Sequence, residues 1–212
     1  MKLLFYDLET TGLDFKENGI IQFAGIIANL DTDNNITLLD KFNFNMKPPK
    51  NKIINEEALA INKYTKEQIQ TFEDSQKIYD KFIQILSKYC DKFNKMDKYV
   101  LVGYNNLHFD NDFLRQWFLD CNDKYFGAWF WSNSIDVMSE ASRYLVQYRP
   151  ALLNFKLSSV AKALDFNINS NELHDGFYDI KLTMKIFLKL LKEPTVKPWD
   201  ENEAERIFNI KY

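Results

Sequence analysis

Cysteine is scarce in this sequence, with two residues, Cys90 and Cys121, in a chain of 212. They form no CxxC pair and no dense framework, so a disulfide scaffold of the secreted type is excluded. Both cysteines lie in segments whose apolar residues recur at helical spacing. We therefore expect two buried free thiols in a protein of a reducing compartment.

Long hydrophobic runs are also lacking. The apolar start of the chain is interrupted by Asp7 and Glu9 before the apolar region of a signal peptide could form. The longest other apolar stretch, residues 19–30, contains Gln22 and is shorter than the ~20 residues that span a bilayer. We expect a cytoplasmic protein with no membrane partner.

An excess of positive charge is absent as well. The 27 Lys and Arg against 30 Asp and Glu give a net charge of −3, which argues against binding nucleic acid by bulk electrostatics but leaves room for a local basic groove. Hydrophobic residues make up 46% and aromatic residues 16%, enough for one large core. The predicted domain covers residues 1–193. Residues 194–212, which begin with Pro194, are predicted to form a tail or short helix.

The order of the predicted elements indicates an α/β fold. Three runs rich in β-branched and aromatic residues, separated by turn formers, predict consecutive strands. A fully apolar run near the middle predicts one more buried strand, and helical spacing of apolar residues predicts the helices. Strands are expected at Leu3–Leu8, Ile20–Ala28, Ile36–Phe44 and Tyr99–Gly103, and helices at Ser75–Phe93, Asp110–Cys121, Asp136–Leu145, Leu157–Leu164 and Tyr178–Lys192.

Asp7 and Glu9 stand two positions apart at the end of the first predicted strand, so both side chains project from one face. A strand end where acids reach water would explain such a pair. The Thr-Thr-Gly turn that follows favours a functional role, because it can present backbone N–H groups to a phosphate that the carboxylates hold through a metal.

Two further acidic positions lie at the ends of regular elements. Asp110 follows the buried strand and opens a helix, and His174 precedes Asp179 in the first turn of a long helix. Capping would explain Asp110, and the helix dipole would explain Asp179. Taken together, however, four acids and one histidine predict a site for Mg²⁺ or Mn²⁺, since crowded carboxylates need cations to neutralise them. The set is typical of two-metal phosphoryl chemistry.

The segments FYDLETTGLD, GYNNLHFDNDF and HDGFYD resemble the three motifs of the DnaQ-like (DEDDh) 3′-to-5′ exonucleases. The resemblance implies an RNase H-like fold with a five-stranded mixed sheet flanked by helices. It also implies that Asp7, Glu9 and Asp179 hold two metal ions and that Asp110 acts mostly through a metal-bound water. His174 would be the general base. The position four before the last acid is Asp175 rather than Tyr, which favours the His-type branch.

The resemblance further implies a substrate, a single-stranded nucleic acid with a free 3′ end. The motifs look most similar to the bacterial exonuclease I branch, which digests single-stranded DNA, so DNA is favoured over RNA. Leu13 resembles the apolar wedge beside the terminal base and Phe109 could stack there, although either could equally be core. Thr10 and Asn106 complete the predicted substrate contacts, with a turn role as the alternative for Asn106. An exoribonuclease of this fold and a proofreading or docking subunit of a polymerase complex remain alternatives.

Overall fold

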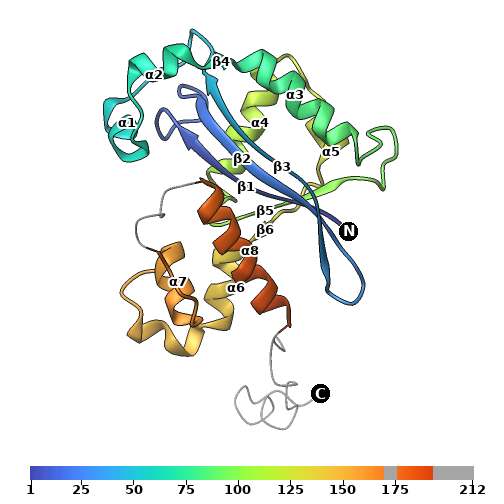
Figure 1. Cartoon of the computed structure of the whole chain (residues 1–212), viewed down its shortest axis with the longest axis vertical. Coiled ribbons are helices and arrows are strands. Elements are labelled where there is room, and N and C mark those ends of the chain that lie inside the picture. Colours follow the sequence, from blue (N-terminus) through green and yellow to red (C-terminus); the bar gives the residue numbers. More distant parts are fainter. Residues whose placement is uncertain (170–175, 193–212) are drawn as a thin grey trace, which may run out of the picture.

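A mixed sheet of six strands runs through the middle of the molecule in the order β4-β3-β2-β1-β5-β6 (Figure 1). The computed structural model describes residues 1–169 and 176–192. The strands are β1 (Lys2–Thr10), β2 (Ile20–Leu30), β3 (Ile36–Lys47), β4 (Glu73–Asp74), β5 (Tyr99–Gly103) and β6 (Ile135–Asp136). The helices are α1 (Glu56–Asn62), α2 (Lys66–Thr71), α3 (Ser75–Ser87), α4 (Asp110–Asp120), α5 (Phe126–Trp129), α6 (Val137–Tyr144), the 3₁₀ helix η1 (Val146–Ala151), α7 (Leu157–Ala163) and α8 (Gly176–Lys192).

The two longest ladders join β1, β2 and β3 as antiparallel neighbours, and β5 pairs with β1 in parallel. Alternation along β1 assigns its side chains to two cores. Leu4 and Leu8 face one side of the sheet, and Leu3 and Phe5 face the other. Because β1 is buried on both faces, it forms the central strand around which the remaining elements pack.

Helices cover both faces of the sheet (Figure 1). On one face, Phe82 of α3 and Trp117 of α4 pack with the side chains of β1 and β2. On the other face, Val137 of α6, Val160 of α7 and Ile180 of α8 enclose the second core. The resulting layers of helix, sheet and helix confirm the predicted α/β class.

Several predicted boundaries differ from the structure. The predicted helix Ser75–Phe93 is too long, because α3 ends at Ser87 and Phe93 is 85% exposed. The sheet has six strands instead of five, since the two-residue β4 adds to the far edge of β3. Both cysteines are free thiols, but only Cys90 is fully buried. Residues 194–212 lie outside the described residues, so the predicted tail stays a prediction.

None of the helices in the described part of the chain combines the length and the apolar character that crossing a bilayer requires.

Candidate active site

Asp7 and Glu9 lie near the carboxyl end of β1, on the face that α8 covers. They continue the alternation of Leu3 and Phe5, which are buried in the core on that face. Phe5 is the last residue of β1 that pairs with β5, so the rest of the strand has one open edge. A register shift between Glu9 and Thr10 also interrupts the pairing with β2. Bulges of this kind re-aim side chains beside functional sites.

Asp110 reaches the same strand end from the start of α4. A tight turn after β5 leads into this helix. Gly103 is required there because an added Cβ would lie 2.7 Å from Cβ of Asn106. Asn105 adopts a left-handed φ of 61°, which asparagine tolerates better than most residues. The backbone N–H of Leu8 then donates to Oδ1 of Asp110 at 3.2 Å. This bond joins α4 to the open edge of β1.

Asp179 approaches the strand from α8, where it lies in the first turn. The helix begins at Gly176, directly against the sheet. A Cβ added at this glycine would lie 3.3 Å from Cβ of Ala24 and 3.8 Å from Oδ2 of Asp7. Ile180, which is buried in the core, holds the helix in this position. A residue without a side chain thus allows α8 to start beside the carboxylate of Asp7.

The four acids are close enough to change one another's ionisation. Burial, followed by the charges of the other three acids, raises the pKa of Asp7 well above its usual value. Burial and then the charge of Asp179 raise the pKa of Glu9 to about 7. Burial also raises the pKa of Asp110 to about 7, against backbone hydrogen bonds that lower it. Near neutral pH the site therefore retains protons that isolated carboxyl groups would release.

The donor set fits a hard divalent cation. Within residues 1–169 and 176–192, no three His, Cys, Asp or Glu side chains converge closely enough to hold a metal ion as they stand. The acids nevertheless offer several carboxylate oxygens, which are the ligands that Mg²⁺ and Mn²⁺ prefer. A cation beside Asp7 and Glu9 would also remove the repulsion that raises their pKa values.

The first two residues of the third motif are not described. His174 and Asp175 lie outside the described residues, so the general base stays a prediction. His108 is exposed in the loop before α4. Gly176 is the first described residue after His174. A Cβ added at Gly176 would lie close to Ala24 and Asp7.

Leu13 and Thr10, two of the four predicted substrate contacts, lie in or beside the turn after β1. Leu13 is 84% exposed, so its side chain is free to contact a bound molecule. Thr10 is buried, and its hydroxyl donates to the carbonyl of Gly12 at 2.7 Å. Thr10 therefore shapes the turn, while Leu13 presents an apolar side chain at its surface.

The other two predicted contacts, Asn106 and Phe109, are less accessible. Asn106 is fully buried, with its Nδ2 3.5 Å from Oδ1 of Asn111. Phe109 is half-buried, and its ring lies 5.0 Å from that of Phe113. Contact between Asn106 and a substrate would require the loop to open, whereas Phe109 can expose one ring edge.

Two polar residues beside the site were missed by sequence reasoning. Asp136 is buried, and it accepts a hydrogen bond from the backbone N–H of Asn105 at 2.9 Å, which fixes the turn before α4. Its position before a helix is the only sequence signal that marks it. Asn111 accepts a hydrogen bond from the hydroxyl of Tyr6 at 2.6 Å. Nothing in the motif pattern distinguishes this asparagine from an ordinary surface residue.

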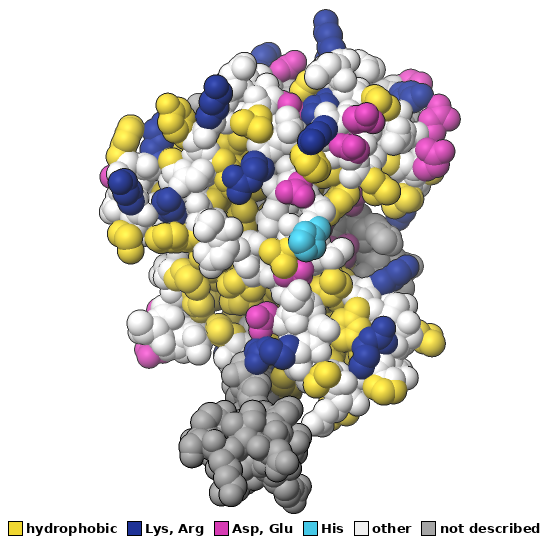
Figure 2. Space-filling view, turned by 180° about the vertical axis from the view of Figure 1, so that it is seen from behind, with side chains coloured by type: hydrophobic (Ala, Val, Ile, Leu, Met, Phe, Trp, Pro, Cys, Tyr) yellow, Lys and Arg dark blue, Asp and Glu magenta, His cyan; other side chains and the backbone are white. Residues whose placement is uncertain are grey.

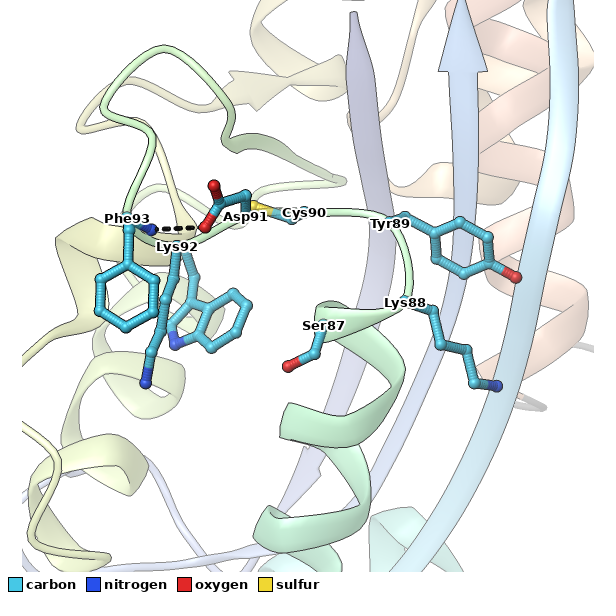
Figure 3. Close-up of a pocket in the computed structure, with 8 residues that line it drawn as sticks. Ser87, Lys88, Tyr89, Cys90, Asp91, Lys92 and Phe93 are labelled. Carbon is cyan, nitrogen blue, oxygen red and sulfur yellow. Dashed lines mark hydrogen bonds between the residues drawn. The ribbon is translucent and has the colours of Figure 1, made fainter.

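The hollow in Figure 3 has about 420 Å³ and is lined by residues 87–93 at the end of α3. It lies at the beginning of β5, where Tyr99 donates its hydroxyl to the carbonyl of Leu86 at 2.8 Å. This is the opposite end of the sheet from the four acids. Asp91, the acidic residue in the lining of this hollow, accepts a hydrogen bond from the backbone N–H of Phe93. Among the described residues that line the hollow there is no cluster of acids.

Charge is mixed on the face drawn in Figure 2. Lys and Arg side chains are interspersed with Asp and Glu, and the described residues on this face form no continuous basic band. The pattern agrees with the net charge of −3. Strong attraction of nucleic acid by this face as a whole is therefore not expected.

Comparison with known proteins links these residues to a family of nucleases. A profile of the family RNase_T, described as exonuclease, matches residues 4–187. Ribonuclease T of Buchnera aphidicola (subsp. Schizaphis graminum) is 24% identical, over 87% of this chain and 80% of that protein. Exodeoxyribonuclease I of Buchnera aphidicola (subsp. Acyrthosiphon pisum) is 28% identical, over 98% of this chain and 52% of that protein. A PolC-type DNA polymerase III of Ureaplasma parvum is 25% identical, over 89% of this chain and 11% of that protein.

Solved structures share the fold. The zinc-bound E. coli ExoI–ssDNA complex superposes with a TM-score of 0.68 at 21% identity, covering 98% of this chain and 42% of that chain. The product-bound structure of exonuclease I gives a TM-score of 0.65 at 23% identity. This chain therefore spans about half the length of the exodeoxyribonuclease I relatives and most of the length of ribonuclease T.

Proposed function

Because this chain belongs to the RNase_T family of exonucleases, we propose that it removes nucleotides one at a time from the 3′ end of single-stranded DNA. The observation that carries the proposal is that β1, α4 and α8 bring acids to one strand end, where burial and then the charges of Asp110, Glu9 and Asp179 raise the pKa of Asp7. Repulsion among these acids works against their ionisation, because each acid disfavours the ionised form of its neighbours.

The proposed reaction is hydrolysis of the last phosphodiester. The oxygen of a water molecule bonds to phosphorus, and the bond from phosphorus to the 3′ oxygen of the preceding nucleotide breaks. His174 takes the proton of the attacking water, and the leaving 3′ oxygen acquires a proton from solvent. The products are a nucleoside 5′-monophosphate and a strand with a new 3′ hydroxyl.

The cofactor in this proposal is a pair of Mg²⁺ ions, for which Mn²⁺ can substitute. When bound, the ions would stabilise the charge on the attacking and leaving oxygens. The proposed ligands are carboxylates, and Asp110 contributes mostly through water. The residues are Asp7, Glu9, Asp110 and Asp179.

The proposed substrate contacts are those of the turn after β1 and the loop before α4. Leu13, exposed at the tip of the turn, would pack against the terminal base. The buried Thr10 would hold that turn, and the half-buried Phe109 would supply a stacking edge. Asn106 would support the loop rather than touch the substrate, because its side chain is enclosed.

Digestion of end-labelled strands tests this proposal. A 5′-labelled single strand of DNA should give a descending ladder with Mg²⁺ and no products with EDTA, and a 3′-labelled strand should release mononucleotide at once. A 3′ phosphate should slow the reaction. Cutting within a circular single strand would contradict the exonuclease proposal.

RNA is the second candidate substrate, and the match to ribonuclease T over 80% of that protein favours it. Discrimination between the two sugars rests on contacts to the 2′ hydroxyl. The same assay with RNA of identical sequence measures the preference. A kcat/KM higher for RNA than for DNA would replace the DNA proposal with an exoribonuclease.

The match to part of a PolC-type polymerase supports a third role, as a proofreading or docking subunit. In that case an added polymerase should raise the digestion rate of mispaired 3′ ends. A rate that the polymerase leaves unchanged would contradict this role and favour an enzyme that acts alone.

A further inference from the structure

Lys52, in the loop after β3, has its charged end inside the protein. Its side chain is 2% exposed. An ammonium group has three N–H donors, and the ammonium of Lys52 has three oxygen partners, one in an ion pair and two in hydrogen bonds. They are Oδ2 of Asp120 at 2.9 Å, the carbonyl of Lys16 at 2.9 Å and the carbonyl of Phe15 at 3.3 Å. Burial of a charge is costly unless it is paired and hydrogen-bonded, and Lys52 meets both conditions.

Two of these acceptors belong to the turn that follows Leu13. The backbone N–H of Asn18 donates to the carbonyl of Asp14 at 2.7 Å, which closes the segment into one turn. The ammonium of Lys52 donates to the carbonyls of residues 15 and 16, which lie within this turn. A cation at the carboxyl end of a helical turn compensates carbonyls that have no backbone donor.

The third acceptor belongs to the helix that begins with Asp110. Asp120 is the last residue of α4. While Oδ2 of Asp120 binds Lys52, its Oδ1 accepts a hydrogen bond from Nε2 of Gln116 at 2.9 Å. Both carboxylate oxygens are thus used. Lys52 therefore connects the turn that directly follows Leu13, called the Leu13 turn below, with the helix that carries Asp110.

We propose that Lys52 is a positioning residue that holds the Leu13 turn against α4 and so determines how well the 3′-terminal nucleotide binds. This inference rests on the proposed exonuclease function. Lys52 does not touch the reacting atoms, because its three donors are already used by Asp120 and the two carbonyls. Without it, the turn samples other conformations, and the apparent affinity falls with the fraction of molecules in the competent one.

The variant Lys52→Met tests the proposal, because methionine fills similar space without a charge or donors. We measure KM and kcat on a 5′-labelled single strand, and the hydrolysis of the p-nitrophenyl ester of thymidine 5′-monophosphate. KM for the strand should rise by about tenfold if the turn remains competent in a tenth of the molecules. The kcat at saturation should be unchanged for both substrates, because the reacting atoms do not touch Leu13. The KM for the ester should rise with that for the strand, because the thymine of the ester takes the place of the terminal base.

Two variants separate positioning from stability. Lys52→Arg keeps a charged donor group and should restore most of the affinity. Asp120→Asn keeps an oxygen that can accept from Lys52 and leaves both carbonyl contacts in place. It should lower the thermal midpoint while KM stays close to that of the wild type. If KM instead follows the thermal midpoint across the three variants, the effect of Lys52 is on folding alone and the proposal is overturned.

A double variant tests the route through Leu13. The KM of Lys52→Met combined with Leu13→Ala should equal that of Leu13→Ala alone, because both changes act on one contact. Independent, multiplying effects would overturn the proposal. Should Lys52→Met be unfolded at the assay temperature, Lys52→Gln replaces it. A KM of Lys52→Gln above that of the wild type then supports the proposal, and a KM equal to that of the wild type overturns it.

The result for the unmodified protein separates this proposal from the one on which it rests. A wild-type chain that hydrolyses neither the strand nor the ester would overturn the exonuclease function and the role of Lys52 with it. A wild-type chain that hydrolyses both, together with a Lys52→Met variant whose kcat falls on both substrates while KM is unchanged, would overturn only the role of Lys52.

Discussion

The backbone N–H of Leu8 donates to a carboxylate oxygen of Asp110 at 3.2 Å, although the two residues are 102 positions apart in the chain. At this point β1 is paired with β2 but has no strand on its other side, because its pairing with β5 ends at Phe5. The side chain of Asp110 therefore takes the place of a missing strand partner. A residue proposed for catalysis is thus also part of the fold.

Substitution of Asp110 should separate these two roles. Asp110→Asn keeps an oxygen that can accept from Leu8, and Asp110→Ala leaves that buried N–H without its acceptor. Both variants should lose most of the exonuclease activity. Asp110→Ala should be less stable than Asp110→Asn by about 1 to 3 kcal/mol, the cost of an unsatisfied buried group. Urea unfolding of both variants provides the measurement, and equal stabilities would contradict a structural role.

Metal binding should stabilise the native protein. Mg²⁺ or Mn²⁺ neutralises the crowded acids of the folded state only, so the thermal midpoint should rise. The gain is about 2.7 kcal/mol at a concentration one hundred times the Kd. Asp7→Ala should abolish most of that rise. A thermal shift series with no response, or with the same response in the variant, would show that the site is assigned to the wrong residues.

The stability of the metal-free protein should fall as the pH rises. Burial and the charge of Asp179 raise the pKa of Glu9 from 4.5 to about 7 in the folded state. The folded state therefore binds the proton more tightly, and this stabilisation is complete below pH 4.5 and lost as the pH rises through about 7.

Thermal midpoints measured with EDTA across this pH range, for the wild type and for Glu9→Gln, test the prediction. Other acids, whose pKa values are lowered, such as Asp31 and Asp97, change stability in the opposite direction. Because they are present in both proteins, their contribution cancels in the difference. The curve of Glu9→Gln should be flatter between about pH 4.5 and 7, and parallel curves in that range would count against the raised pKa.

Replacement of His174 should affect the rate without affecting the metal. A general base acts on a proton of the attacking water, so His174→Ala should lower the single-turnover rate by about 10² to 10⁴. The metal-induced rise in thermal midpoint should be retained. If the variant keeps the wild-type rate and pH dependence, another group is the base.

Gly176 should be more sensitive to a methyl group than Gly127. A Cβ at Gly176 would lie 3.3 Å from Cβ of Ala24 and would push the start of α8 away from Asp7. A Cβ at Gly127 meets no atom within 4 Å. Gly176→Ala should therefore lower kcat/KM with little change in stability, because alanine also favours the helix. Gly127→Ala, the control, should leave activity unchanged, and equal effects in the two variants would contradict the proposed packing.

The main strands and the longer helices could be predicted from the sequence, because strong periodic patterns mark them. The predicted Leu3–Leu8 and Tyr99–Gly103 correspond to β1 and β5. The end of α3 could not be predicted, since Phe93 continues the helical spacing although its side chain is exposed. Spacing alone does not show whether an apolar residue finds a partner.

The candidate acids could be proposed from the sequence because they mark strand and helix ends, and their roles stay predictions. In the structure the charges of Asp110, Glu9 and Asp179 all act on the carboxyl group of Asp7. Lys52 could not be found in this way, because a lysine in a loop resembles any solvated lysine until its acceptors are known. Its three acceptors come from two distant segments, and such a meeting depends on the complete fold.

Because β1 is made first and α8 only after every strand of the sheet, the arrangement has a consequence for biosynthesis. A ribosome releases Asp7 and Glu9 long before Asp179. The nascent chain can thus assemble the sheet before Asp179 has been synthesised. A site that needs Asp179 can therefore form only after all the strands of the sheet have been synthesised.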